Sequence, residues 1–149
     1  MPYELPRDSN GFVQAHDHPD IQDGHVIIRK ISDQHVINDP KVEGGRRISS
    51  AAVNASTGGS KGMSVDLEAL IISAGYDPYQ YVTTPKWIGS IQFTAQTLRG
   101  LAYQVGQDPV PENPFHGEVW GAFTKPKQKQ LLKSSAWYVE IPQVVLSPT

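Results

Sequence analysis

The segment that most constrains the fold is residues 25–31 (HVIIRKI), a β-branched run between Gly24 and a polar turn. Alternate residues of an extended chain share a face, so Ile27, Arg29 and Ile31 lie on one side. The opposite side also begins apolar, and a strand that is apolar on both faces is typical of the middle of a sheet. An arginine between two isoleucines is costly to desolvate unless it is paired or meets an anionic ligand. The sequence therefore predicts a central strand with a charge that needs a carboxylate or a bound anion. The available carboxylates are Glu118, Glu140 and Asp66.

The rest of the chain alternates between short strand patterns and short helix patterns, with no linker or internal repeat. Start and stop signals predict one helix that begins at Asp66, with Gly75 just past its end, and two more that begin after Thr94 and after Thr124. We therefore predict one α+β domain, in which about three short helices accompany a mostly antiparallel sheet of five or six strands. The further predicted strands are residues 46–53, 63–65, 87–93, 116–121 and 137–141.

Composition excludes several classes of protein. The chain of 149 residues has no cysteine, which excludes a disulfide scaffold, a zinc finger and a thiol nucleophile. A net charge of −2 excludes a globally basic nucleic-acid binder. No apolar run approaches the ~18 residues of a membrane span, and the first residues lack a basic start and an apolar stretch. We therefore expect a soluble, cytoplasmic protein of one domain, with no membrane partner.

The first 24 residues differ in composition from the rest of the chain. They carry five acidic side chains against the single Arg7, three prolines and no apolar periodicity. This predicts an acidic irregular N-terminal arm over residues 1–24, ahead of a single α+β domain over residues 25–149. In the arm, His16 and His18 flank an aspartate, and such donors bind divalent ions. A floppy segment loses conformational entropy on forming a site, so we favour incidental histidines and assign no metal site.

The candidate site combines the arginine of the first strand with polar residues of two later segments. Ser49 and Ser50 stand on a predicted neighbouring strand, where small alanines leave room for a ligand. A rigid proline-rich loop leads into Asn113 and His116, so we expect the imidazole to be held, and Glu118 follows on the same strand face. The alternative is a buried arginine–glutamate pair with a structural histidine. The predicted catalytic residues are His116, as acid or base, and Glu118, and the predicted ligand-binding residues are Arg29, Ser49, Ser50 and Asn113.

A lysine-bearing segment is the one feature that points to nucleic acid. Lys125, Lys127, Lys129 and Lys133 lie within nine residues that contain no acid. Such a patch holds phosphates, but it is also typical of the solvent face of a helix whose leucines point inward, which is the interpretation we favour. We therefore expect a nucleic-acid partner only through these four lysines.

Four short motifs follow one another along the chain: IRKI at 28–31, ISSAA at 48–52, MSVD at 63–66 and NPFH at 113–116. In this order they resemble a family of short, uncharacterised bacterial proteins with Tyr-Arg-Arg-Ile, Ser-Ser-Ala-Ala-Phe, Ser-Val and Asn-Pro-Ala-His motifs. The resemblance covers most of residues 25–141. The chain departs from the family in Lys30, Val53 and Phe115, which replace arginine, phenylalanine and alanine. The resemblance implies one domain rather than a particular activity.

The order of Arg29, Ser49 and Glu118 also resembles, more weakly, that of ADP-ribosyltransferase-like folds. This resemblance implies that Arg29 binds a dinucleotide, that Ser49 supports a nicotinamide pocket, and that Glu118 polarises a ribose hydroxyl. The chain departs from the pattern because it lacks the Ser-Thr-Ser motif and is small for such an enzyme.

Two functions follow from these residues. The first is a domain that binds or acts on a nucleotide or another phosphate-bearing small molecule, with Arg29 as anion anchor and His116 as acid or base. The alternative is a non-catalytic protein-interaction module, accessory, antitoxin-like or immunity-like, that binds a partner protein through the acidic arm and exposed tyrosines. The residues do not decide whether the protein is an enzyme, and they name no cofactor.

Overall fold

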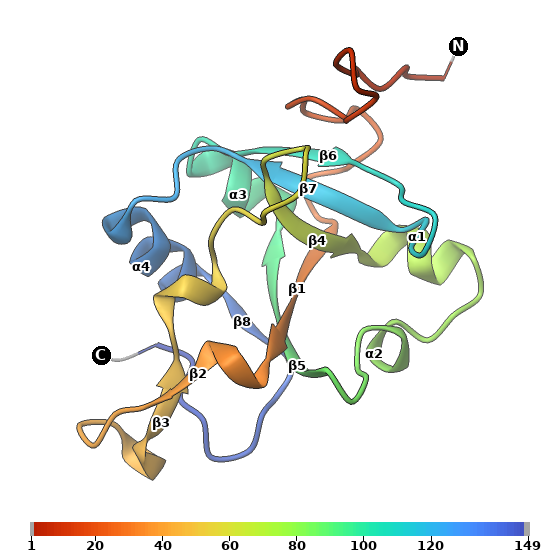
Figure 1. The fold of residues 1–149 in the computed structure, drawn as a ribbon. Helices are drawn as coiled ribbons and strands as arrows, with labels where there is room; N and C mark the ends of the chain where they lie inside the picture. The colour runs from red at the N-terminus through yellow and green to blue at the C-terminus, as the bar shows by residue number, and fades with distance from the viewer. Residues whose placement is uncertain (1, 148–149) are drawn as a thin grey trace.

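A computed structural model describes residues 2–147 and has an α+β fold, which confirms the predicted class. Six antiparallel strands form one sheet in the order β6-β7-β4-β1-β5-β8 (Figure 1). The first predicted strand is β1 (Val26–Ser32), and it lies in the middle as expected, between β4 (Met63–Leu67) and β5 (Trp87–Thr94). The outer strands are β6 (Gln104–Gln107), β7 (His116–Trp120) and β8 (Ala136–Val139).

Short helices and a small hairpin surround this sheet. β2 (Val36–Asn38) and β3 (Arg46–Ile48) pair with each other in a separate two-stranded sheet. The α-helices are α1 (Glu68–Ser73), α2 (Pro78–Tyr81), α3 (Ala95–Gly100) and α4 (Lys125–Ser134), and the 3-10 turns are η1 (Asp33–His35), η2 (Glu43–Gly45) and η3 (Ser50–Ala52). In the described part of the chain, no helix has the length and apolar character needed to span a membrane.

Local signals set the helix ends as the sequence predicts. The hydroxyl of Thr94 accepts a hydrogen bond from the backbone N–H of Thr97 at the start of α3, and that of Thr124 accepts one from Lys127 at the start of α4. Gly75 follows α1 with φ +88°, a left-handed conformation that glycine adopts without a side-chain clash.

The central strand is buried on both sides. Ile27 faces the larger core, where Leu98 of α3 and Leu131 of α4 pack. Ile28 faces the other way and packs with Ile71 of α1. Two covered faces are what the apolar run of residues 25–31 requires, because each fully buried aliphatic side chain contributes about 1.5–3 kcal/mol.

The two central strands β1 and β4 separate after a short stretch of pairing. Their register covers Ile27↔Leu67 and Ile28↔Asp66 only, although both strands continue, whereas β1 pairs with β5 along its whole length. Figure 1 shows β4 and β7 crossing the direction of β1 instead of running beside it. This separation opens a gap at the level of Arg29, inside the sheet rather than at its edge.

Several predicted boundaries differ from the structure. Residues 46–53 do not form one strand: β3 ends at Ile48, because the side chain of Ser49 accepts a hydrogen bond from Ala51 and starts η3. Asp66 does not start a helix but lies in β4, and α1 begins at Glu68. The sequence pattern also misses β6, and it treats as a loop the aromatic segment that contains α2.

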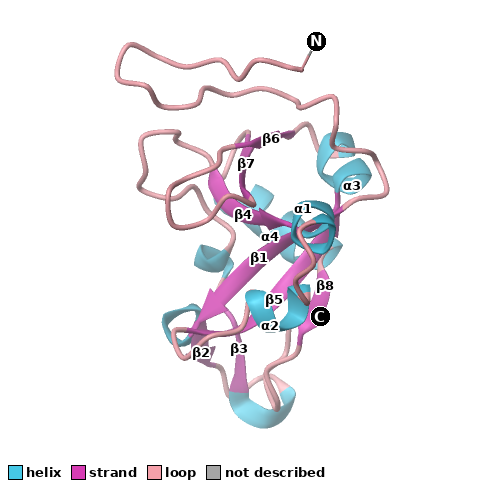
Figure 2. Cartoon of the chain, turned by 90° about the vertical axis from the view of Figure 1, so that its right-hand side faces the viewer, coloured by secondary structure: helices cyan, strands magenta, loops and turns pink. Residues whose placement is uncertain are grey.

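The N-terminal segment is irregular, as predicted, and it packs against the domain. Figure 2 shows it as a loop along one end of the molecule, beyond β6. Its buried side chains include Val13 and Ile21, and its two histidines, His16 and His18, are also buried. Arg99 of α3 holds the segment through the carboxylate of Asp17, among other groups. The predicted acidic arm is therefore not floppy: buried side chains and an ion pair with α3 hold it against the domain.

Candidate functional site

A polar pocket of about 280 Å³ opens where β1 and β4 separate. β1 contributes Arg29 and Lys30, β4 contributes Asp66, and β7 contributes His116. Its volume lies close to the lower end of small-ligand sites, about 300–1,000 Å³. The pocket brings together two residues predicted from the sequence, Arg29 and His116, with a second cation and a carboxylate. The other lining residues are His35, Ser56, Ser64, Val65 and Trp87.

The guanidinium of Arg29 is held by the backbone rather than by a carboxylate. Its Nε donates to the carbonyl of Ala52 at 2.9 Å, and its Nη1 donates to the carbonyl of Ser64 at 2.8 Å. Burial lowers the pKa of Arg29 to about 10, opposed by the charges of Glu118 and Asp66, so the side chain stays charged at neutral pH. Within residues 2–147 it forms no ion pair, so the buried arginine–glutamate pair considered as the alternative does not form.

Asp66 supplies the carboxylate of the pocket and is itself neutralised. Its Oδ2 lies 3.5 Å from Nζ of Lys30, and its Oδ1 accepts a 2.6 Å hydrogen bond from the amide of Asn113. Asn113 in turn accepts a hydrogen bond from the hydroxyl of Tyr81 at 2.8 Å. The predicted ligand-binding residue Asn113 therefore lies behind Asp66, outside the lining of the pocket. Because Lys30 balances Asp66, Arg29 is the excess charge among the described side chains that line the pocket.

His116 is oriented from behind by Asp108. Its Nδ1 lies 2.7 Å from the backbone carbonyl oxygen of Asp108 and 3.5 Å from the carboxylate of that residue. A carbonyl only accepts, so Nδ1 carries the proton and Nε2 is left as an acceptor. The hydroxyl of Ser60 fixes the Asp108 carboxylate at 3.0 Å. The imidazole is thus held in one tautomer at the wall of the pocket.

Glu118 is buried behind the pocket and does not line it. It is 2 % exposed, and its Oε2 has no hydrogen-bond partner among the described residues. Burial, followed by the nearby charge of Asp108, raises the pKa of Glu118 to about 7, while a hydrogen bond from Ser64 and the charge of Arg29 oppose this rise. The predicted catalytic Glu118 therefore does not face a ligand; it contacts Ser64, which does.

Asp108, His116 and Glu118 also bring three donor atoms within 4.8 Å of one another. Carboxylate and imidazole donors at such distances suit a divalent ion. However, Nδ1 of His116, the nitrogen nearest the Asp108 carboxylate, donates its proton to a carbonyl, and a metal ligand must be deprotonated. The hydrogen bond therefore excludes Nδ1 as a ligand and leaves Nε2 as the nitrogen of His116 available to an ion or to a proton.

His35 adds a neutral hydrogen-bond donor to the lining. Its Nδ1 accepts a 3.1 Å hydrogen bond from the backbone N–H of Ser32, so its proton is on Nε2. Burial lowers the pKa of His35, and the positive charge of Arg29 lowers it further. The ring is therefore uncharged at neutral pH.

The predicted ligand-binding serines lie outside this pocket. Ser49 is the N-terminal cap of η3, where its hydroxyl accepts from the backbone of Ala51 at 3.2 Å. Ser50 accepts a 3.4 Å hydrogen bond from Nζ of Lys125 and lines a different pocket. The predicted strand over residues 46–53 is not a neighbour of β1: β3 pairs only with β2 in the separate two-stranded sheet and ends before these serines.

The two histidines of the N-terminal segment are occupied by the protein itself. Nδ1 of His16 donates to the carbonyl of Gln14 at 2.9 Å, and its Nε2 accepts from the backbone N–H of Gln107 at 3.2 Å. His18 accepts from the backbone N–H of Asp20 and packs edge to face against His16. With both ring nitrogens of His16 in use, these residues anchor the segment.

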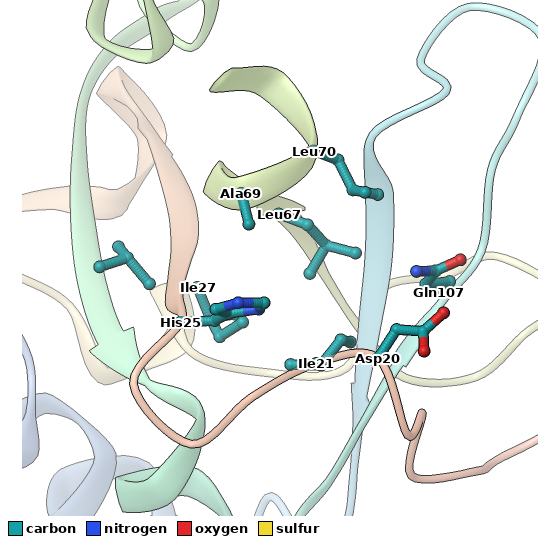
Figure 3. A pocket seen from close by; sticks show the side chains of 9 residues that line it. Asp20, Ile21, His25, Ile27, Leu67, Ala69, Leu70 and Gln107 are labelled. Carbon is teal, nitrogen blue, oxygen red and sulfur yellow. The ribbon is translucent and has the colours of Figure 1, made fainter. Parts of the chain in front are cut away.

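A smaller cavity of about 100 Å³ lies beneath the same segment. Figure 3 shows Leu67 and Leu70 directed toward Ile21, with the side chains of Asp20 and Gln107 at one side. Its walls are mainly apolar, and it contains no lysine or arginine among its described lining residues. This cavity is too small and too apolar for a charged ligand, so the pocket at Arg29 is the candidate site.

Sequence reasoning does not place Lys30, His35, Ser56, Ser64 or Asp108 at the site, and it includes Asp66 only as one of three carboxylates available to Arg29. Lys30 carried a signal, because a lysine next to Arg29 on a buried strand must also reach solvent or a carboxylate. Asp66 is one of the carboxylates expected near Arg29, but the sequence predicts it as the start of a helix, and in the structure it contacts Lys30 and Asn113 instead.

Comparison with known protein families, curated proteins and solved structures finds no match to this chain. The resemblances noted in the sequence therefore stay predictions.

Proposed function

We propose that the protein binds a nucleotide or another phosphate-bearing ligand in the pocket between β1 and β4, with Arg29 as the anion anchor. The observation that supports this most directly is that Arg29 lines the pocket, keeps its charge and, among the described residues, donates its hydrogen bonds to backbone carbonyls and not to a carboxylate. A buried charge without a directly paired carboxylate is costly, and although Glu118 and Asp66 act on Arg29 from a distance, an anionic group of a ligand would contact it directly. Guanidinium groups also present a planar set of donors that suits phosphate.

The remaining lining residues have complementary roles in this proposal. Lys30 adds a second positive charge beside the ligand, and the proton on Nε2 of His35 adds a neutral donor. His116 presents Nε2 as the acid or base, because Asp108 engages its other nitrogen. Glu118 acts behind them as a positioning residue through Ser64.

Two lysines that lie over the same aromatic ring allow a matched test. Lys30 and Lys86 both lie over the ring of Trp87, at 5.1 and 4.9 Å, but only Lys30 lines the pocket. We expect isothermal titration with a nucleoside monophosphate to give a Kd about tenfold weaker for Lys30→Gln, because one charge is lost and Asp66 is left unpaired. Lys86→Gln, with the same change of charge, should bind like the wild type.

The same titration distinguishes the anion from the rest of the ligand. Inorganic phosphate should bind more weakly than the nucleotide but respond to Lys30→Gln in the same direction. Absence of binding by both anions in the wild type, or equal weakening by Lys30→Gln and Lys86→Gln, would contradict the proposal.

An exposed aromatic patch supports the second candidate, a protein-interaction module. Ile72 of α1, Tyr79 of α2 and Tyr76 of the segment between them are each more than half exposed, and aromatic side chains contribute strongly to interfaces. A second copy of the chain is the simplest occupant to test. Self-association in sedimentation velocity that disappears in Tyr76→Ser/Tyr79→Ser would support this candidate, and a concentration-independent monomer would remove that occupant.

A further inference from the structure

A second pocket, of about 330 Å³, lies between α4 and the segment that joins β3 to η3. Lys129 and Lys133 line it together with Arg47 and Ser50, and none of its described lining side chains is acidic. Arg47 already contacts the carboxylate of Asp39 at 2.7 Å. The lysines of α4 therefore provide the excess positive charge of this pocket.

Three of the four lysines of α4 share one exposed face. Lys125, Lys129 and Lys133 recur every four residues, which places successive side chains about 6 Å apart along the helix. Lys127 differs, because it is half-buried and its Nζ donates to the carbonyl of Leu101 at 3.3 Å. The distance between successive lysines in this exposed row is similar to the distance between successive phosphates in an extended nucleic-acid strand.

The turn η3 connects this row of lysines to the pocket at Arg29. At one end of the turn, the carbonyl of Ala52 accepts from Arg29; at the other, the hydroxyl of Ser50 accepts from Nζ of Lys125. Three residues of 3-10 helix span only about 6 Å. Between the two ends lies the exposed, small side chain of Ala51, which leaves the surface of the turn open.

We infer that the phosphate-bearing ligand is a single-stranded nucleic acid, whose backbone runs from the pocket at Arg29, over η3, onto the lysine row of α4. This inference rests on the proposed function, because one nucleotide of the strand occupies the pocket described above. Charge complementarity carries it: two positively charged sites lie on either side of one short turn, and a polyanion with regularly spaced phosphates contacts both.

A single strand fits this path better than a duplex. The path bends around a turn and includes a pocket that takes one nucleotide, and a flexible strand follows such a path without the cost of bending a stiff double helix. The five cations Arg29, Lys30, Lys125, Lys129 and Lys133 predict a slope of about −3.5 for log K against log salt concentration. Binding is therefore expected to be salt-sensitive.

Fluorescence anisotropy with a labelled oligouridylate of about eight nucleotides tests the inference. We expect the oligonucleotide to bind the wild type at least tenfold more tightly than uridine monophosphate. Lys129→Gln/Lys133→Gln should lose that gain and reduce the salt slope by about 1.4, while its binding of uridine monophosphate stays unchanged. The control Lys41→Gln/Lys127→Gln carries the same change of net charge and should retain the gain.

The outcomes separate this inference from the proposed function. An oligonucleotide that binds no more tightly than the monophosphate overturns the inference and leaves the pocket intact. Equal losses in the two double-lysine variants also overturn it, because general charge then explains the affinity. The proposed function fails if the oligonucleotide binds, the monophosphate does not, and Lys30→Gln leaves the oligonucleotide affinity unchanged. The continuous path then fails as well, because it includes the pocket.

Discussion

Two clusters of the molecule combine an arginine with a buried or half-buried histidine, and they differ in how completely these groups are satisfied. In the N-terminal segment, both ring nitrogens of His16 are hydrogen-bonded to the backbone. In the pocket, His116 has one nitrogen held by Asp108, and its Nε2 remains an acceptor. The same residue type therefore anchors a segment in one place and faces a ligand pocket in the other.

The arginines show the same contrast. Arg99 donates to the carboxylates of Asp17 and Asp23 at 3.0 and 2.8 Å and to the carbonyl of Ile21 at 2.7 Å. Arg29 meets two backbone carbonyls and no carboxylate. A charge matched by two carboxylates has little left to offer an anion, whereas a charge that meets only neutral acceptors still attracts one.

The largest expected effect is in the N-terminal cluster. Arg99→Met removes four hydrogen bonds from a charged donor, two of them to exposed carboxylates, and leaves the carbonyl of Ile21 unpaired, so we expect a loss of about 3 kcal/mol in the free energy of unfolding. Thermal unfolding should shift down by about 10 °C. Nucleotide binding by the protein that stays folded should not change.

Arg7→Met is the control for this change. Arg7 lies in the same segment and donates only to the nearby carbonyl of Gly11, so its replacement should cost less than about 1 kcal/mol. If Arg99→Met weakened nucleotide binding as strongly as a change in the pocket does, the separation of the two clusters would be wrong.

Glu118→Gln tests the buried charge behind the pocket. The folded pKa of about 7 lies above the unfolded value of 4.5, so the native state binds more protons between these values, and wild-type stability falls as pH rises through that window. Glutamine keeps the carbonyl that accepts from Ser64 and cannot ionise. Above pH 7 the variant should be more stable by up to about 3 kcal/mol.

Urea unfolding at several pH values between 4 and 8 measures this difference. The control is Glu112→Gln, which changes an exposed carboxylate a few residues earlier and should leave the pH dependence as it is in the wild type. Equal pH slopes for wild type and Glu118→Gln would mean that Glu118 is ionised in the folded protein throughout this range.

Arg29→Met tests the pocket cluster directly. Two carbonyl acceptors lose their donors, but the cost of burying a charge also disappears, so we expect a net loss of about 2 kcal/mol. The rise in melting temperature caused by a nucleotide in the wild type should disappear. A variant that keeps the full ligand-induced rise would contradict the role of Arg29 as anchor.

The sequence predicts those parts of the fold that depend on neighbouring residues. The β-branched, apolar residues on both faces of the segment 25–31 predict β1 and its central position. Threonine caps predict the starts of α3 and α4. β6 is missed because Gln104–Gln107 has little apolar alternation and becomes a strand only by pairing with β7. The early end of β3 depends on one side-chain hydrogen bond of Ser49, which competes with an otherwise strand-like pattern.

The same distinction between local and long-range signals applies to the residues of the candidate site. Arg29 and His116 stand out in the sequence because each is unusual in its local setting, a charge in an apolar strand and an imidazole after a rigid loop. Asp66 stands out only as one of three carboxylates available to Arg29, because its actual contacts with Lys30 and Asn113 join different segments. Contacts between segments distant in sequence leave no local pattern from which to predict them.

The smallest expected effect is the loss of stability in His116→Ala, which we compare with that in His16→Ala. His116→Ala removes one hydrogen bond to the carbonyl of Asp108 from a half-buried ring, so the loss of stability should stay below about 1 kcal/mol, or about 4 °C in melting temperature. His16→Ala should cost more, because it removes two hydrogen bonds and the ring that packs against Trp120.

Calorimetry of both variants, with and without a nucleotide, completes the comparison. His16→Ala should lower the melting temperature and keep the ligand-induced rise. His116→Ala should leave the melting temperature nearly unchanged and reduce any activity that depends on proton transfer at Nε2. His116→Gln should not restore that activity, because an amide can hydrogen-bond to the ligand but cannot exchange a proton near neutral pH. A fall in melting temperature for His116→Ala as large as that for His16→Ala would make His116 a structural residue, because its hydrogen bond to Asp108 would then hold the loop rather than orient the ring.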